Sequence, residues 1–183
     1  MTEPLFFDTD CLSAFLWTDQ GSIITRLYPG RVVIPQLVFD ELDRVSTPAF
    51  KKRTAILSKH SAVTIRDIEI TSPAFSLYRE MTTHPQPGFK AVGRGEAAAM
   101  ALAIIEHGIV ASNNFRDTAT YIRSYNLAYK TTGHILVDAY ENALVTMEEA
   151  NRIWAEMLAA NRWLGAASFT DFYDKPIDPL RGF

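Results

Sequence analysis

The chain has 183 residues, of which 48% are hydrophobic and 21% are charged, and these values exclude a disordered polymer. The formal net charge of −3 excludes a global positive field that gathers nucleic acid, so a phosphate ligand must be held by local cations or a metal ion. A single cysteine, no apolar run near the roughly 20 residues of a membrane span and no signal-peptide pattern predict a cytoplasmic protein without a membrane partner.

The first half of the chain alternates short apolar runs with helical spacing. Strands are expected at 5–7 and 31–34, and a strand or hairpin edge within 62–70. The expected helices are 11–17, 21–28, a helix opened by Pro35, 49–58 and 73–81. Asp8 ends the first strand, and Asp10 is expected to cap the first helix because aspartate is favoured at that position.

The middle of the chain reads GRGEAAAMALAIIEHGIVASNNFRD over residues 93–117. Glu96 begins a run whose apolar residues recur every three and four positions, which predicts a helix that stops near Gly108. The short apolar run of residues 109–111 then predicts a buried strand. Ser112 and Asn114 follow at once, with Asp117 beyond, where ligands bind in parallel sheets.

The remaining pattern predicts a helix at 118–125, a strand at 128–130 and a helix at 135–143. Thr146 and Glu149 form a capping box that opens another helix. We expect one domain over 1–183 with an extra C-terminal helical region at about 146–183. The alternation of strands and helices predicts an α/β fold with a central, mainly parallel sheet between two helical layers.

Four carboxylates are candidates for one site: Asp8, Glu41, Glu96 and Asp117. Each alone has an ordinary explanation as a helix cap, a first-turn acid or a solvated residue. As a set in one cleft they would repel each other and raise each other's pKa values unless a cation joined them. All-oxygen ligation suits Mg²⁺ or Mn²⁺, which activate water and stabilise charge on a phosphodiester.

Four motifs resemble those of PIN-domain ribonucleases, especially the VapC-like toxins of type II toxin–antitoxin modules. They are FFDTDCLSAFL, VVIPQLVFDEL, GRGEAAAMALA and IVASNNFRD, and the resemblance extends over roughly residues 5–160. It implies a PIN-like three-layer sandwich and a metal-dependent endoribonuclease that hydrolyses RNA phosphodiester bonds. It also implies an RNA substrate, a cognate antitoxin that blocks the cleft, and a homodimer.

Carried over position by position, the resemblance makes Asp8, Glu41, Glu96 and Asp117 catalytic. Asp8, Glu96, Asp117 and Asn114 become the ligands of Mg²⁺ (or Mn²⁺). Positions 113 and 114, often aspartate in relatives, are both asparagine here, so the number of metal ions stays open.

Substrate contacts are expected from Arg94 and Arg116, which flank the presumed site, and from Ser112. The basic run of residues 51–53 could touch an RNA backbone, but its pattern favours a solvated helix face.

Three other functions remain open from the sequence. The paired asparagines favour a catalytically weakened PIN scaffold that binds RNA or protein. The same site chemistry also serves a structure-specific DNA nuclease. A phosphatase-like hydrolase with Asp8 as nucleophile lacks a matching lysine motif.

Overall fold

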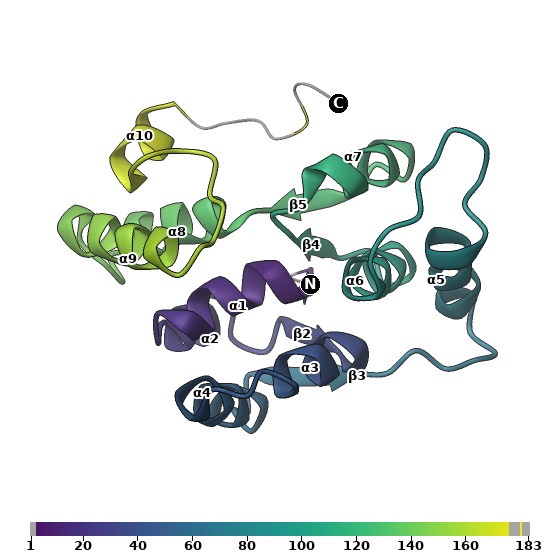
Figure 1. Cartoon of the computed structure of the whole chain (residues 1–183), viewed down its shortest axis with the longest axis horizontal. Helices are drawn as coiled ribbons and strands as arrows, with labels where there is room; N and C mark the ends of the chain where they lie inside the picture. The colour runs from purple at the N-terminus through teal and green to yellow at the C-terminus, as the bar shows by residue number, and fades with distance from the viewer. Residues whose placement is uncertain (1–2, 176–179, 181–183) are drawn as a thin grey trace.

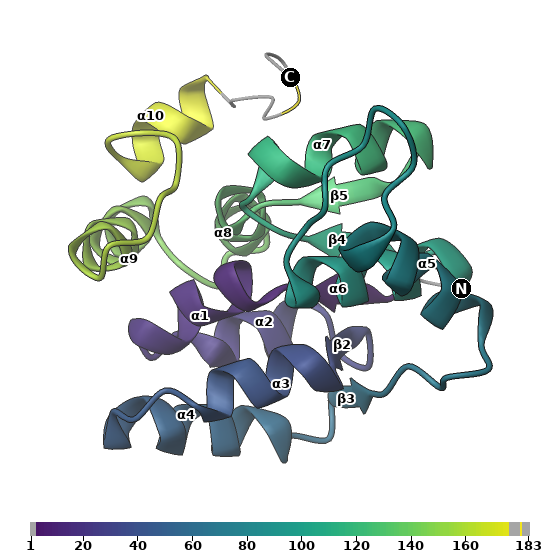
Figure 2. The same cartoon turned by 45° about the vertical axis from the view of Figure 1, so that its right-hand side comes forward.

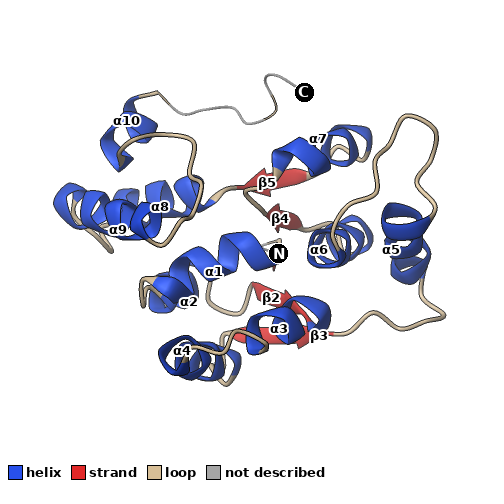
Figure 3. Cartoon of the chain, viewed as in Figure 1, coloured by secondary structure: helices blue, strands red, loops and turns tan. Residues whose placement is uncertain are grey.

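The computed structural model describes residues 3–175 and 180. Its centre is a sheet of five parallel strands in the order β3-β2-β1-β4-β5 (Figures 1 and 3). The strands are β1 (Leu5–Phe7), β2 (Val32–Pro35), β3 (Val63–Arg66), β4 (Ile109–Ala111) and β5 (Ala128–Lys130). The predicted parallel α/β sheet is confirmed, and residues 62–70 contribute a parallel edge strand rather than a hairpin.

Ten helices surround this sheet in the described residues. They are α1 (Thr9–Trp17), α2 (Gly21–Leu27), α3 (Gln36–Asp43), α4 (Pro48–Ser58), α5 (Pro73–Thr83), α6 (Arg94–Ile105), α7 (Phe115–Ser124), α8 (Thr132–Glu141), α9 (Met147–Ala159) and α10 (Phe169–Asp174). None of them is long and apolar enough to cross a membrane.

The helices form one layer on each face of the sheet (Figure 2). Successive side chains of a strand point to opposite faces, so β1 serves both layers. Leu5 and Phe7 pack with α1, α2, α8 and α9, whereas Phe6 packs with α5, α6 and α7. The result is the predicted three-layer sandwich, and it brings the carboxyl ends of β1 and β4 side by side.

Several helix ends differ from the prediction. The first helix begins at Thr9 and its cap is Asp8, not Asp10, because the Asp8 carboxylate accepts a hydrogen bond from the Cys11 N–H. Helix α7 begins at Phe115 and α8 at Thr132, each three residues earlier than predicted. The first residues of both helices do not continue the apolar repeat, and a prediction from apolar periodicity therefore begins each helix too late.

Gly108 follows α6 as predicted, but for a different reason. The left-handed backbone conformation after the helix belongs to His107, with φ of 51°. A Cβ atom on Gly108 would lie 2.7 Å from the Pro4 carbonyl oxygen and 2.5 Å from Cε2 of Phe6. Glycine at this position therefore allows the chain to enter β4 against β1.

The C-terminal region packs on the α8 face of the sandwich. The capping box of Thr146 and Glu149 is confirmed. Trp154 of α9 is fully buried, and its indole N–H donates to the Ala166 carbonyl at 3.1 Å. The tail beyond Gly165, which had no clear sequence pattern, contains α10, whose Phe172 lies 5.3 Å from Trp154 between ring centroids.

Candidate active site

Asp8 occupies the carboxyl end of the central strand. Its backbone N–H donates to the Ala111 carbonyl at 2.9 Å, which joins the ends of β1 and β4. Its Oδ1 atom accepts the Cys11 N–H at 2.7 Å as the cap of α1. The residue is 1% exposed, and Oδ2 has no hydrogen-bond partner among the described residues. An acceptor atom is thus buried without a donor, which is costly in a finished core.

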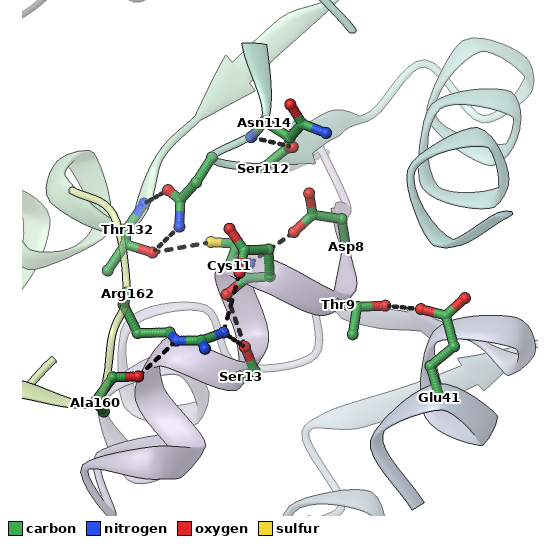
Figure 4. A network of polar contacts seen from close by, with 12 residues as sticks. Asp8, Thr9, Cys11, Ser13, Glu41, Ser112, Asn114, Thr132, Ala160 and Arg162 are labelled. Atoms are coloured by element: carbon green, nitrogen blue, oxygen red, sulfur yellow. Dashed lines mark hydrogen bonds and ion pairs between the residues drawn. The ribbon is translucent and has the colours of Figure 1, made fainter. Parts of the chain in front are cut away.

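The charge state of Asp8 follows from this environment. Burial raises the pKa of the carboxyl to about 8, against the lowering effects of the Ser112 hydroxyl and the Cys11 N–H. The negative charges of Asp10 and Glu96 raise the pKa further. Ser112 lies beside Asp8 (Figure 4), although its geometry leaves Oδ2 without a hydrogen bond. Without a cation, Asp8 is therefore mainly protonated at neutral pH.

Asn114 connects two other predicted site residues. Glu96 lies in the first turn of α6, and Asp117 in the first turn of α7, which Asn114 caps. The Asn114 side-chain nitrogen donates to Glu96 Oε1 at 3.1 Å and to Asp117 Oδ2 at 3.3 Å. A neutral amide thus separates two carboxylates, and its nitrogen, rather than the oxygen expected of a metal ligand, faces them.

Asn113 has a different task from its neighbour. It is buried, its Oδ1 accepts the Thr132 N–H at 2.9 Å, and its Nδ2 donates to Thr132 Oγ1 at 2.9 Å. These bonds tie the end of β4 to the start of α8. The asparagine at 113 is therefore explained by local structure.

Glu41 reaches the same edge of the sheet from α3. Its Oε2 accepts the Thr9 hydroxyl at 2.5 Å (Figure 4). A Cβ atom on Gly95 would lie 2.7 Å from Thr9 Oγ1 and 3.1 Å from Glu41 Oε2. Gly95, one residue before Glu96, therefore lets the first turn of α6 approach this pair closely.

Two further residues lie at this edge of the sheet. Asp10 was expected only to cap a helix, and no role was expected for Arg162. The charge of Asp10 contributes to the raised pKa of Asp8, and Asp10 itself has a raised pKa because of burial. Nη1 of Arg162 binds Asp10 Oδ1 at 3.2 Å and Ser13 Oγ at 3.3 Å. Arg162 lies 152 residues further along the chain, so no local pattern signals this contact.

The sequence profile of a PIN-domain family matches residues 5–175. The chain belongs to the PIN-domain family. No curated protein matches it significantly. PIN domains are generally nucleases and typically use divalent metal ions, so the family places this chain on a nuclease fold.

The donor atoms of this PIN domain fit a hard divalent cation by their chemistry. Asp8 Oδ2 is a buried oxygen to which no described residue donates, and the surrounding side chains offer further oxygen atoms. Within residues 3–175 and 180, however, no three Asp, Glu, His or Cys side chains stand where they could together hold a metal ion. Because like charges repel, we expect Glu96 and Asp117 to turn toward Asp8 only when a cation compensates them.

Of the predicted substrate residues of the PIN domain, Ser112 lies beside Asp8, whereas the two arginines are exposed outside the cluster. Arg94 is exposed, and its Nε donates to the Tyr78 hydroxyl at 3.2 Å. Nε of Arg116, whose side chain is 83% exposed, lies 4.0 Å from Asp117 Oδ1. In the basic run, Arg53 pairs with Asp19 at 3.0 Å and binds the Leu16 and Trp17 carbonyls, which gives it a structural role.

Replacing Asn114 with Asp tests the role of the neutral amide. We expect Asn114→Asp to destabilise the metal-free protein by about 1–3 kcal/mol, because two donated hydrogen bonds become contacts between like charges. The added carboxylate should also make thermal stabilisation by Mn²⁺ appear at a lower concentration. Melting curves with EDTA and over an Mn²⁺ titration measure both effects. Asn126→Asp, beyond the other end of α7, is the matched control and should show neither.

Proposed function

We propose that the protein is an Mg²⁺- or Mn²⁺-dependent endoribonuclease that hydrolyses RNA phosphodiester bonds. The observation that carries this proposal is the buried Oδ2 of Asp8, which has no hydrogen-bond partner in the described part of the chain. It lies where the ends of β1 and β4 meet, beside Glu96 and Ser112. Membership of a family that generally consists of nucleases supports it.

Asp8, Glu96 and Asp117 would hold the metal ion, with the Asn114 oxygen as a neutral ligand after rotation of its amide. When bound, such an ion neutralises the carboxylates, lowers the pKa of water and stabilises negative charge on a phosphodiester. Asp8 must lose its proton to act, so lower pH opposes its role.

The other predicted residues would orient the substrate. Glu41, held by Thr9 and close to Gly95, keeps a carboxylate at the rim of the site. Arg94 and Arg116 are exposed cations that can bind RNA phosphates on either side, and the Ser112 hydroxyl faces Asp8.

Incubation of the purified protein with pooled transfer RNA, with and without Mg²⁺ or Mn²⁺, tests this function. We expect fragments only when the metal ion is present. A competing single-stranded DNA of the same length separates ribonuclease from deoxyribonuclease activity. Intact RNA under all metal conditions, with correctly folded protein and several RNA types, would contradict the proposal.

A second candidate is a PIN scaffold that binds RNA or protein without cleaving. The observation that favours it is the Asn114 nitrogen, which satisfies Glu96 and Asp117 without any cation. Titration calorimetry with Mg²⁺ and Mn²⁺ discriminates the two functions. Binding at or below millimolar concentration supports the nuclease, whereas no binding supports the scaffold.

We further propose that the nuclease is the toxin of a type II toxin–antitoxin system, a cytoplasmic homodimer that a small antitoxin protein blocks. The similarity of the four motifs to those of VapC-like toxins supports this role. Induced expression of the chain alone should stop bacterial growth. Normal growth with soluble protein present in the cells would argue against toxicity.

A further inference from the structure

Trp163 follows α9, and its side chain is not part of the hydrophobic core. Its side chain is 69% exposed, and among the Phe, Tyr and Trp residues in the described part of the chain it is the one that is exposed. Within that same part, its ring stacks on no other ring and its indole N–H donates no hydrogen bond. Trp154 shows the contrast, because it is fully buried and its indole N–H is bonded to Ala166.

The residues on both sides of Trp163 are held in place. Arg162 binds Asp10 and Ser13 in α1, and its Nε donates to the Ala160 carbonyl at 3.1 Å (Figure 4). Leu164, on the other side, is buried in the core. The indole ring is therefore presented to solvent from a fixed backbone, which reduces the entropy lost when a ligand packs on it.

Trp163 borders residues that adjoin the candidate active site. Trp163 lines a small hollow together with Asn113 and Phe115, the two neighbours of Asn114 in the chain. Asn114 in turn donates to Glu96 and Asp117. Arg162, the residue before Trp163, binds Asp10, and the charge of Asp10 raises the pKa of Asp8.

We propose that Trp163 stacks on an unpaired nucleobase of the RNA next to the bond that is cleaved. This inference rests on the proposed ribonuclease function and assigns to Trp163 the contact with a base in a single-stranded segment or a loop. Bases in a duplex are already stacked on their neighbours, whereas an unpaired base can place its face on an aromatic ring. Every base has such a face, so Trp163 favours unpaired RNA without selecting one base.

Binding of a short single-stranded RNA to Asp8→Asn protein tests the inference, because this background removes cleavage. In it, Trp163→Ala should weaken binding by about 5-fold to 150-fold, the range for loss of one stacked base. Trp163→Phe should retain most of the affinity. Ile56→Ala, which truncates an exposed apolar side chain on α4, is the control and should bind like the parent.

Tryptophan fluorescence and kinetics distinguish stacking by Trp163 from a purely structural role of this residue. RNA should quench the emission of the parent protein but not that of Trp163→Phe. In the cleaving protein, Trp163→Ala should raise KM more than it lowers kcat.

Equal RNA affinity of Trp163→Ala and its parent would overturn the stacking inference, and if the wild type cleaves RNA the nuclease proposal would still stand. A wild-type protein that neither binds nor cleaves any RNA would instead overturn the nuclease proposal and this inference with it.

Discussion

Asp8→Asn protein should cleave RNA more than about 100-fold more slowly than wild type, which exceeds the usual effect of losing a residue that only supports a metal ligand. Asparagine keeps the shape of aspartate, and its Oδ1 can still accept the Cys11 N–H that caps α1. The substitution replaces the ionisable carboxyl with a neutral amide, so no negative charge can form at the buried Oδ2 position. We therefore expect a folded protein without activity, measured by initial rates on a fluorescent RNA at saturating Mn²⁺.

The same variant should change the pH dependence of stability in the absence of metal. The pKa of Asp8 is raised from 3.8 to about 8 in the folded protein, so the folded state binds this proton more tightly than the unfolded state. Wild-type stability should therefore fall as pH rises from about 4 to about 8, by at most about 1.4 kcal/mol per pH unit from this residue. Asp8→Asn lacks that loss, so its stability relative to wild type should increase across this window and level off above it.

Asp19→Asn provides the matched control for Asp8→Asn. Asp19 lies beyond the other end of α1 and pairs with Arg53 at the surface, so its replacement makes the same Asp-to-Asn change away from the site. It should retain wild-type activity and the wild-type dependence of stability on pH. Wild-type cleavage by Asp8→Asn protein would remove Asp8 from the mechanism.

Features that depend only on residues close together in the chain could be predicted from the sequence. Asp8 follows a three-residue apolar strand, and Glu96 opens a helix with a clear apolar repeat, so both could be placed at the edge of a parallel sheet. The capping box of Thr146 and Glu149 is a local motif of the same kind. These patterns determine the strands and helices because backbone hydrogen bonding and burial impose fixed periods.

Contacts between distant segments could not be predicted in the same way. Asp10 looked like a cap because aspartate is common there, and only the fold shows that Arg162 binds it. The two asparagines looked alike in sequence, yet Asn113 bonds to Thr132 and Asn114 to Glu96 and Asp117. Side-chain direction at a strand end depends on the neighbouring elements, which the local sequence does not encode.

Glu96→Gln should also reduce RNA cleavage by more than about 100-fold. Unlike Asp8→Asn, it leaves the Asp8 carboxyl in place and should lower the pKa of that group. Glutamine keeps an oxygen that can accept the Asn114 amide, whereas the negative charge is lost. That charge now contributes to the raised pKa values of Asp8 and Asp10. The variant should therefore ionise Asp8 at lower pH while binding Mn²⁺ more weakly, because one charged ligand is missing.

These two effects distinguish a direct role of Glu96 from an indirect one. The carboxyl carbon signal of Asp8 in a pH titration by NMR reports its ionisation, and calorimetry reports Mn²⁺ binding. Glu106→Gln is the control, because Glu106 caps the other end of α6 and pairs there with Arg66 at 3.4 Å. If Glu96 acted only through the pKa of Asp8, raising the pH should make wild-type and Glu96→Gln rates equal. A ligand of the metal ion should instead leave the variant inactive at every pH, and this is the result we expect.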